Sequence, residues 1–400
     1  MKITAIVAEY NPFHLGHNYH LQSAREITGC DGVICIISGN FMQRGIPAII
    51  DKWKRAELAV LNGADLVVEL PLVYSISSAE GFGSGAIKIL NSIGIVDNLF
   101  YGSEHHSNEE LIKITDILLE PPANFTASLK ESLSKGLPYH TAREIALSEI
   151  TDSTILKSPN NILAIEYLKA LKKYKSEIKP ISLKREGSGY NDALINKSSF
   201  SSATSIRLAL QKNKDINHIK DSVSQTTYDY LLSLQKENYN FIFEESMFNY
   251  LKYKILTQGE RLKYIDEVSE GLDNKIISEI SKSKSLNDFI LNVKSKRYTY
   301  TRISRILSRF FIGLENYDVK KIEKTSESYL RPLAFNNTGR HILKEIKEKN
   351  IIKIITNVNK NNDNSMLDLD ILGTKAYSVL NNSVLPYQDL LKSPIYIGKE

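Results

Sequence analysis

Short apolar runs alternate with amphipathic segments through the first half of the chain. Runs rich in Val, Ile and Leu at 2–8, 32–38, 65–71 and 97–103 predict four buried strands. The segments between them, at 17–28, 51–62 and 79–94, have apolar positions at helical spacing and meet a glycine at their ends. A fifth strand is expected at 177–185. This alternation predicts an α/β fold, a doubly wound parallel sheet with helices on both faces.

The pattern changes twice further along the chain. Residues 105–150 have a helical pattern with a break at "EPPANF", and we interpret them as an insertion; a helix with Ser158 as its N-cap follows. Beyond about residue 215 the sequence is mostly helical and rich in Lys, Ser and Asn, and "RPLAFNNTGRHILKEIKEK" is one basic helical candidate there. We therefore predict one domain over 1–215 and a second, mainly helical domain over 216–400.

The composition is typical of a soluble globular protein with this organisation. The chain has 400 residues, of which 42% are hydrophobic, enough for two domains with real cores. No run approaches the ~20 apolar residues of a membrane span, and the N-terminus lacks the segments of a signal peptide, so we expect a cytoplasmic location. Cys30 and Cys35 have no second cysteine pair or nearby histidine to complete a zinc set, and we interpret them as reduced thiols.

Charge is unevenly distributed between the two parts of the chain. Residues 1–150 contain 11 Lys and Arg against 17 Asp and Glu, whereas the remainder contains 40 against 29. This asymmetry indicates a polyanionic partner that contacts mainly the later part. Ordinary solvated lysines would give the same counts.

The stretch "AEYNPFHLGHNYHL" lies where the first strand turns into the first helix. At that corner a helix N-terminus offers unpaired N–H groups and a partial positive charge, which suit a phosphate. His14 and His17 are three residues apart, with Gly16 between them, and two imidazoles there can donate hydrogen bonds to phosphate oxygens. A metal site is disfavoured because the stretch offers no third ligand in an obvious position beside His14 and His17. The alternative to phosphate binding is that these two histidines only cap the helix and pack.

Several motifs follow one another along most of the chain: "VAEYNPFHLGHNYHL", "SGNFMQRGIPAI", "ADLVVELP", "LFYGSE", "SPNNILAIEYLKAL", "KREGSGYND", "SSATSIR" and "RYTYTRISRIL". Together and in this order they resemble the bacterial tRNA(Met) cytidine acetate ligase family, within the HxGH nucleotidyltransferase superfamily. The resemblance implies a Rossmann-like catalytic domain of the HIGH type over 1–215 and a tRNA-binding domain after it. It also implies a ligase that joins acetate to ATP as acetyl-adenylate, releases pyrophosphate and acetylates the wobble cytidine of elongator tRNA(Met) to N4-acetylcytidine.

The resemblance also implies which residues bind ATP. His14 and His17 would be the catalytic pair that steadies the phosphates, while His20 contacts phosphate or packs. The positions that it places on ATP are Val7, Ala8, Glu9, Tyr10, Asn11, Pro12, Phe13, His14, Leu15, Gly16, His17, Asn18, His20, Gly102, Asn160 and Arg185.

"SSATSIR" resembles the second signature of the superfamily, a loop that closes over the triphosphate. Its matching positions are Ser202, Thr204 and Arg207, while Ala203 stands where many relatives have a second serine. Locally, a helix N-cap at Ser202 or Thr204 explains the same stretch. We expect Mg²⁺ to accompany the phosphates, although no acidic cluster marks a dedicated metal site.

Two further segments are candidates for substrate contact. The loop after the second strand contains residues that we expect to face acetate or cytosine: Gln43, Arg44, Asp51, Lys52 and Lys54. In "KSKRYTYTRISRILSRFF" three arginines fall on one helix face opposite an apolar stripe, which predicts a tRNA-binding surface made of Lys296, Arg297, Arg302, Arg305 and Arg309. A solvated amphipathic helix is the alternative for this segment.

Two other functions fit parts of the sequence. An adenylyltransferase acting on a small carboxylate or phosphate would use the same corner, but it would not need the basic helical second domain. A non-catalytic RNA-binding sensor of nucleotides would need the second domain, but not an intact His14, Gly16 and His17.

Overall fold

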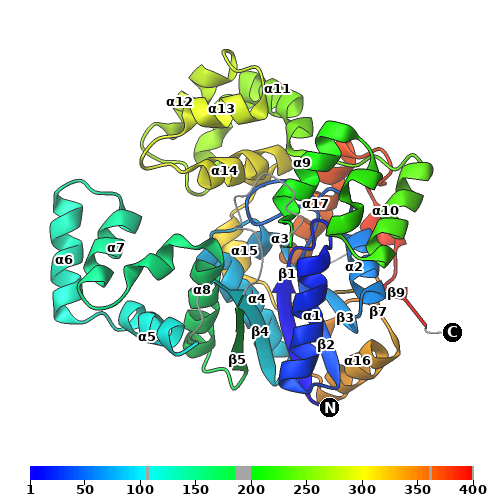
Figure 1. Ribbon diagram of the computed structural model, residues 1–400. Helices are drawn as coiled ribbons and strands as arrows, with labels where there is room; N and C mark the ends of the chain where they lie inside the picture. Colours follow the sequence, from blue (N-terminus) through cyan, green and yellow to red (C-terminus); the bar gives the residue numbers. More distant parts are fainter. Residues whose placement is uncertain (105–107, 185–199, 360–362, 399–400) are drawn as a thin grey trace.

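A seven-stranded sheet lies at the centre of the structure. The computed structural model describes residues 1–104, 108–184, 200–359 and 363–398 (Figure 1). The strand order across the sheet is β5-β4-β1-β2-β3-β7-β9. The strands are β1 Ile3–Ala8, β2 Gly32–Ser38, β3 Leu66–Leu70, β4 Asn98–Ser103, β5 Lys179–Lys184, β7 Pro332–Phe335 and β9 Ile395–Tyr396.

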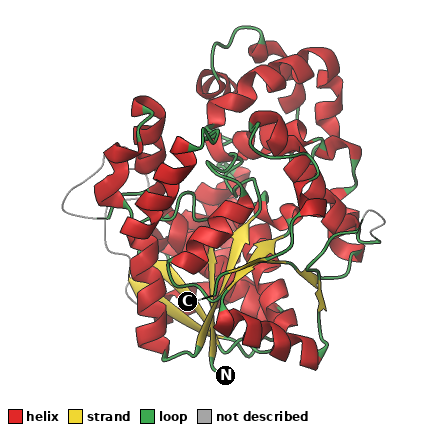
Figure 2. Ribbon diagram, turned by 90° about the vertical axis from the view of Figure 1, so that its right-hand side faces the viewer, coloured by secondary structure: helices red, strands yellow, loops and turns green. Residues whose placement is uncertain are grey.

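Strands β1 to β5 pair in parallel, which confirms the predicted α/β fold. The helices that follow them are α1 Leu15–Thr28, α2 Lys52–Leu61, α3 Leu72–Ser75, α4 Ala79–Ile93 and α8 Pro159–Lys173. Alternate side chains of β2 enter two cores: Ile34 and Ile36 pack with residues of α4 and α8, whereas Val33 and Ile37 pack with residues of α1 and α2. Helices therefore cover both faces of the sheet (Figure 2).

Helices follow β4 in the described residues of the segment that we interpreted as an insertion. It contains α5 Asn108–Leu119, α6 Ala123–Ser134, α7 Tyr139–Ser148 and a short 3-10 helix at Ser153–Lys157. The break predicted at "EPPANF" separates α5 from α6, where Pro122 precedes the first turn of α6. Helices α6 and α7 lie to one side of the sheet in Figure 1.

The chain beyond residue 200 is mainly helical in its described parts. Helices α11 to α14 lie above the carboxyl ends of the strands in Figure 1. The helices are α9 Ala203–Asn213, α10 Gln225–Lys236, α11 Phe248–Gln258, α12 Leu272–Ile280, α13 Leu286–Val293, α14 Tyr300–Ile312, α15 Val319–Thr325, α16 Asn337–Lys349, α17 Ser365–Leu380 and α18 Gln388–Leu391; β6 Tyr329–Leu330 and β8 Lys353–Ile354 form a small second sheet.

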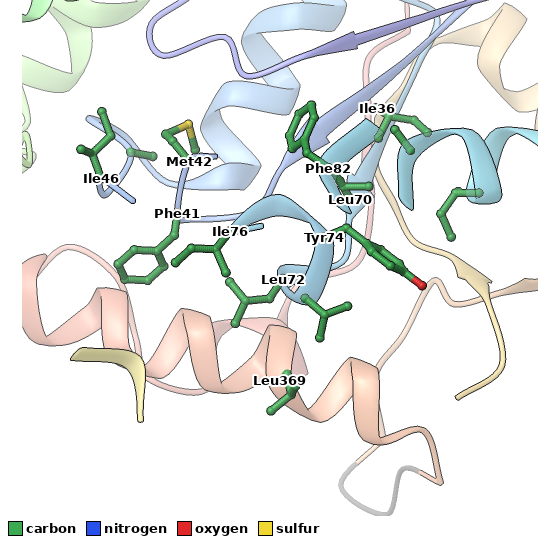
Figure 3. Close-up of a cluster of buried hydrophobic side chains, with 14 of the residues drawn as sticks. Ile36, Phe41, Met42, Ile46, Leu70, Leu72, Tyr74, Ile76, Phe82 and Leu369 are labelled. Carbon is green, nitrogen blue, oxygen red and sulfur yellow. The ribbon is translucent and has the colours of Figure 1, made fainter. Parts of the chain in front are cut away.

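The last part of the chain also completes the central sheet, which the sequence pattern did not predict. Strand β7 pairs antiparallel with β3, and β9 pairs parallel with β7. Helix α17 joins the core as well, since Leu369 packs in the same buried cluster as Leu72 and Ile76 (Figure 3). The central sheet thus contains strands from both sides of residue 215, where we had expected one domain to end.

Candidate active site

A cavity of about 330 Å³ opens at the carboxyl ends of β1 and β4. Its walls come from the corner between β1 and α1, the loop after β2, and the first turns of α4, α8 and α9. The predicted site residues that line it are Val7, Ala8, Glu9, Tyr10, Asn11, His14, Gly16, His17, His20, Gly102, Asn160, Ser202, Thr204 and Arg207. Pro12, Phe13, Leu15 and Asn18 belong to the same corner without lining the cavity, and Arg185 lies outside the described residues.

His14 and His17 stack on each other at the start of α1. Their ring centroids are 3.7 Å apart at an interplanar angle of 25°. His14 is the N-cap, and its Nδ1 accepts a hydrogen bond from the N–H of Gly16 at 3.1 Å. The Nδ1 of His17 accepts from the N–H of His14 at 3.3 Å. Because both Nδ1 atoms are acceptors, the proton of each neutral ring lies on Nε2.

Gly16 makes room for this pair. A Cβ at this position would lie 3.0 Å from Cε1 of His14 and 3.6 Å from Cβ of Phe200. The first of these distances is too short for an unstrained contact between carbon atoms. A side chain here would therefore displace the imidazole of His14.

Contacts of Tyr10 and Asn11 hold the turn before α1 in place. Tyr10 has a left-handed backbone with φ of 49°, and its buried ring packs on Phe13 and His17. The Oδ1 of Asn11 accepts from the N–H of Ile49 at 2.8 Å, and Asn11 is joined to Pro12 by a cis peptide bond. Burial raises the pKa of the Tyr10 hydroxyl, so this group stays protonated.

The "SSATSIR" segment closes the cavity above α1. Ser202 is the N-cap of α9, and its Oγ accepts from the N–H of Ser205 at 3.1 Å. Arg207 donates from Nη1 to the carbonyl of Asn11 at 2.8 Å and from Nη2 to Oγ1 of Thr204 at 3.3 Å. The capping interpretation is therefore correct for Ser202, and the segment still places a guanidinium against the strand-to-helix corner.

The opposite wall is formed by β4 and α8. Asn160 in the first turn of α8 donates from Nδ2 to Oε1 of Glu104, which follows β4. The next residue, Asn161, accepts at Oδ1 from Oγ of Ser103 at 2.8 Å. Gly102 lies in this wall, and His20 packs on Phe100 with centroids 5.0 Å apart while it also lines the cavity.

The loop after β2 divides between the cavity and the protein interior. Gln43 and Arg44 line the cavity, as expected. Asp51 is instead the N-cap of α2, Lys52 is fully buried with Glu69 and Asp389, and Lys54 lies over the ring of Tyr239. The prediction that these three face substrate was wrong, because the start of α2 turns them away from the cavity.

Arg55 is a positioning residue that sequence reasoning missed. It is fully buried and donates to the carbonyls of Glu9 at 2.8 Å and Ser38 at 2.9 Å, and also to those of Gly39 and Ile50. One guanidinium thus ties the ends of β1 and β2 together below the cavity. A buried arginine among carbonyls has no local sequence signal, since its partners lie both after β1, at Glu9, and between β2 and α2, at Ser38, Gly39 and Ile50.

The predicted basic face of α14 is buried at Arg305 and Arg309 and only partly exposed at Arg302. The side chains of Arg302, Arg305 and Arg309 are 31%, 10% and 9% exposed, and each pairs with Glu267 at 3.3–3.5 Å. Arg309 also donates from Nε to the carbonyl of Ile76 at 3.0 Å. The apolar stripe is buried as predicted, but the arginines serve internal ion pairs.

Helix α14 instead holds the loop after β2. The Oγ atoms of Ser304 and Ser308 donate to the carbonyl of Gly45 at 2.9 and 2.5 Å. Gly45 has φ of 75°, and a Cβ there would lie 2.4 Å from the backbone nitrogen of Arg305. Of the predicted tRNA contacts, Lys296 and Arg297 remain exposed, and Arg297 pairs with Glu270.

Two further features are absent from the part of the chain that the structure describes. No group of three or more His, Cys, Asp or Glu side chains there is placed to hold a metal ion. Among the helices described, none is long and apolar enough to cross a membrane. Magnesium remains an expectation tied to the phosphates of ATP.

Comparison with known proteins agrees with this arrangement. The model of the HIGH Nucleotidyl Transferase family matches residues 1–390. A tRNA(Met) cytidine acetate ligase of Clostridium novyi is 49% identical over 99% of this chain and 100% of its own, and one of Clostridium kluyveri is 46% identical over the full length of both.

Two solved structures of Thermotoga maritima TmcAL cover all of both chains. The form bound with alpha-thio ATP has a TM-score of 0.89 at 32% identity, and the apo form has a TM-score of 0.91 at 33% identity. The chain belongs to the HIGH nucleotidyl transferase family and, within it, to the tRNA(Met) cytidine acetate ligases.

Proposed function

We propose that this protein activates acetate with ATP and transfers the acetyl group to the wobble cytidine of elongator tRNA(Met). The observation that supports this most directly is the stacked pair of His14 and His17, whose Nε2 donors stand at a helix N-terminus inside a cavity. The relatives that share the full length of the chain have this activity in their names.

In the first step an acetate oxygen attacks the α-phosphate of ATP, and pyrophosphate leaves. Acetate is already an anion at neutral pH, so this step needs positioning and charge neutralisation rather than a base. The Nε2–H groups of His14 and His17 and the first N–H groups of α1 donate to the phosphates as negative charge moves onto pyrophosphate. Arg207, held against the carbonyl of Asn11, adds a fixed positive charge on the same side.

In the second step the exocyclic amine of cytidine attacks the acetyl carbon, and AMP leaves. The wobble base lies in a single-stranded loop, so it turns into the cavity at less cost than a base from a duplex. We assign part of the tRNA contact to Lys296 and Arg297, which are exposed, and none of it to the three arginines of α14.

The test uses the purified full-length chain with ATP, labelled acetate and an unmodified elongator tRNA(Met) transcript. Acetate-dependent exchange of pyrophosphate into ATP reports the first step, and nucleoside mass spectrometry for N4-acetylcytidine reports the whole reaction. We expect both signals, and we expect His17→Asn to lower the exchange by about 100-fold because Asn keeps an acceptor for the His14 N–H but loses the Nε2 donor. His218→Asn is the matched control, since His218 is exposed and pairs with Asp215, three residues away.

Two results would favour other functions. Exchange with a different small acid, without acetylcytidine in any tRNA, would indicate an adenylyltransferase for a small substrate. Absence of ATP turnover with every acid and tRNA would indicate a nucleotide-sensing RNA-binding protein.

A further inference from the structure

The cavity has two sides that differ in chemistry. On the side of β4, Gly102 and Asn160 occupy the positions that the family resemblance gives to ATP. On the side of β2, the wall consists of Gln43, Arg44 and Ile46, whereas Tyr167 of α8 lies beside Tyr101 of β4. Because β2 and β4 flank β1 on opposite edges, a nucleotide on the β4 side leaves the β2 side for the acetyl group and its acceptor.

Glu9 stands at the end of β1, between these two sides. Its Oε1 accepts from the N–H of Gln43 at 2.6 Å, and its carbonyl accepts from Nη1 of Arg55 at 2.8 Å. Both the backbone and one carboxylate oxygen are therefore fixed. Within the described part of the chain no hydrogen bond is made to the second oxygen, Oε2. Glu9 lines the cavity and is only partly buried.

The surroundings of this carboxylate suit a neutral amine better than an anion. A fixed negative charge repels the triphosphate, so Glu9 is poorly suited to hold that part of ATP. The amine of cytosine presents N–H donors, and Glu and Asp are the side chains that accept from it when proteins read this base. Burial, and next the charge of Glu9, raise the pKa of the Tyr167 hydroxyl, so this hydroxyl stays protonated in the cavity that both residues line.

We propose that Glu9 is the catalytic base of acetyl transfer, accepting an N4–H of cytidine at Oε2. This inference rests on the proposed function of the site. As the lone pair of N4 forms the bond to the acetyl carbon, the bond from that carbon to the AMP oxygen breaks and its electron pair leaves with AMP. The N4 proton passes to the Glu9 carboxylate. His14 and His17 are unsuited to this task, because their Nδ1 atoms hold backbone N–H groups and their Nε2 atoms already have protons.

Glu9→Gln separates the proposed role from a structural one. The amide keeps an oxygen to accept from the Gln43 N–H, so the loop stays attached, but it presents an NH₂ group to the cytidine amine and cannot take its proton. We expect the single-turnover rate of acetyl transfer from preformed acetyl-adenylate to fall by about 100-fold or more. Pyrophosphate exchange should fall by less than about 10-fold, because adenylation needs no base.

Controls make each outcome decisive. Glu26→Gln makes the same chemical change at an exposed position of α1 and should alter neither rate. Glu9→Asp, which keeps a carboxylate, should recover part of the transfer rate lost in Glu9→Gln. Equal losses in exchange and transfer, or an unchanged transfer rate, would overturn the assignment of Glu9. Exchange without any tRNA acetylation by the wild-type protein would overturn the proposed function itself, and the role of Glu9 with it.

Discussion

Lys52→Met tests the buried charges that join the sheet to the end of the chain. The Lys52 side chain is 0% exposed, and its Nζ lies 2.7 Å from Oε1 of Glu69 and 3.0 Å from Oδ1 of Asp389. Arg331 completes the cluster at 3.5 Å from Glu69 and 3.1 Å from Asp389. Methionine keeps the apolar stem but leaves two buried carboxylates facing one guanidinium.

The expected cost follows from this geometry. Removal of one partner from a buried, hydrogen-bonded ion pair destabilises proteins by about 3–5 kcal/mol, mostly because a charge is left uncompensated. This is a large part of the ~5–15 kcal/mol by which proteins are usually stable. With a urea m-value of about 3 kcal/mol/M, the unfolding midpoint of Lys52→Met should fall by about 1–1.7 M.

Urea titration followed by circular dichroism measures this shift, and a second substitution tests its cause. Adding Glu69→Gln to Lys52→Met restores one carboxylate against Arg331, so the double variant should unfold at higher urea than the single variant. Burial alone would raise the pKa of Asp389, but Lys52 and Arg331 hold it below its usual value. The cost of Lys52→Met should therefore shrink as the pH falls, because the stranded carboxylates take up protons.

A matched change at the surface provides the control. Lys135 pairs with Glu131, but both side chains are more than 60% exposed, and Lys135→Met should shift the midpoint little. A cost for Lys52→Met as small as that of Lys135→Met would refute the reasoning. A double variant less stable than Lys52→Met would refute it equally, since it would show that the charge imbalance is not the cause.

Three other changes have distinct expected results. Gly16→Ala should lower pyrophosphate exchange by about 10-fold or more without lowering the urea midpoint, because the methyl group displaces the His14 ring; an unchanged exchange rate would contradict this. Arg305→Met should destabilise the protein and leave the salt dependence of tRNA affinity as it is, since Arg305 pairs with Glu267; a flatter salt slope would show that it faces RNA. Burial, and next the charge of Glu69, raise the pKa of Asp370 to about 7. Between about pH 4 and 7 the folded state therefore holds a proton on Asp370 that the unfolded state has lost, so the free energy of unfolding falls as the pH rises through that window. Asp370→Asn should flatten this slope in urea midpoints measured from pH 4 to 7, and an unchanged slope would exclude Asp370 as its source.

The strand-to-helix corner could be predicted from the sequence because its determinants are local. An apolar run, a glycine between two histidines and a following helical pattern all fall within residues 2–28, and the structure has β1 and α1 there. The Nδ1 bonds of His14 and His17 are also local, since they reach backbone groups two or three residues away. Interactions between residues this close in sequence can be inferred from the local sequence pattern.

The arginines of α14 show that a local sequence pattern does not predict contacts with residues distant in the sequence. Their spacing correctly predicts an amphipathic helix, but spacing cannot reveal that Glu267 and the carbonyl of Ile76 neutralise the polar face. Both partners are distant in sequence. Strand β7 was missed for a related reason: Pro332–Phe335 is too short to show alternation, and its pairing with β3 decides its conformation.

The position of β7 has a consequence for synthesis of the protein on the ribosome. Strand β3 ends at Leu70, and the strand that pairs with its free edge begins only at Pro332. At usual elongation rates of about 5–20 residues per second, the nascent chain exposes an apolar strand edge for tens of seconds. Such an edge pairs readily with other chains. Ribosomes that stop before Pro332 should therefore release aggregation-prone fragments rather than a smaller active enzyme.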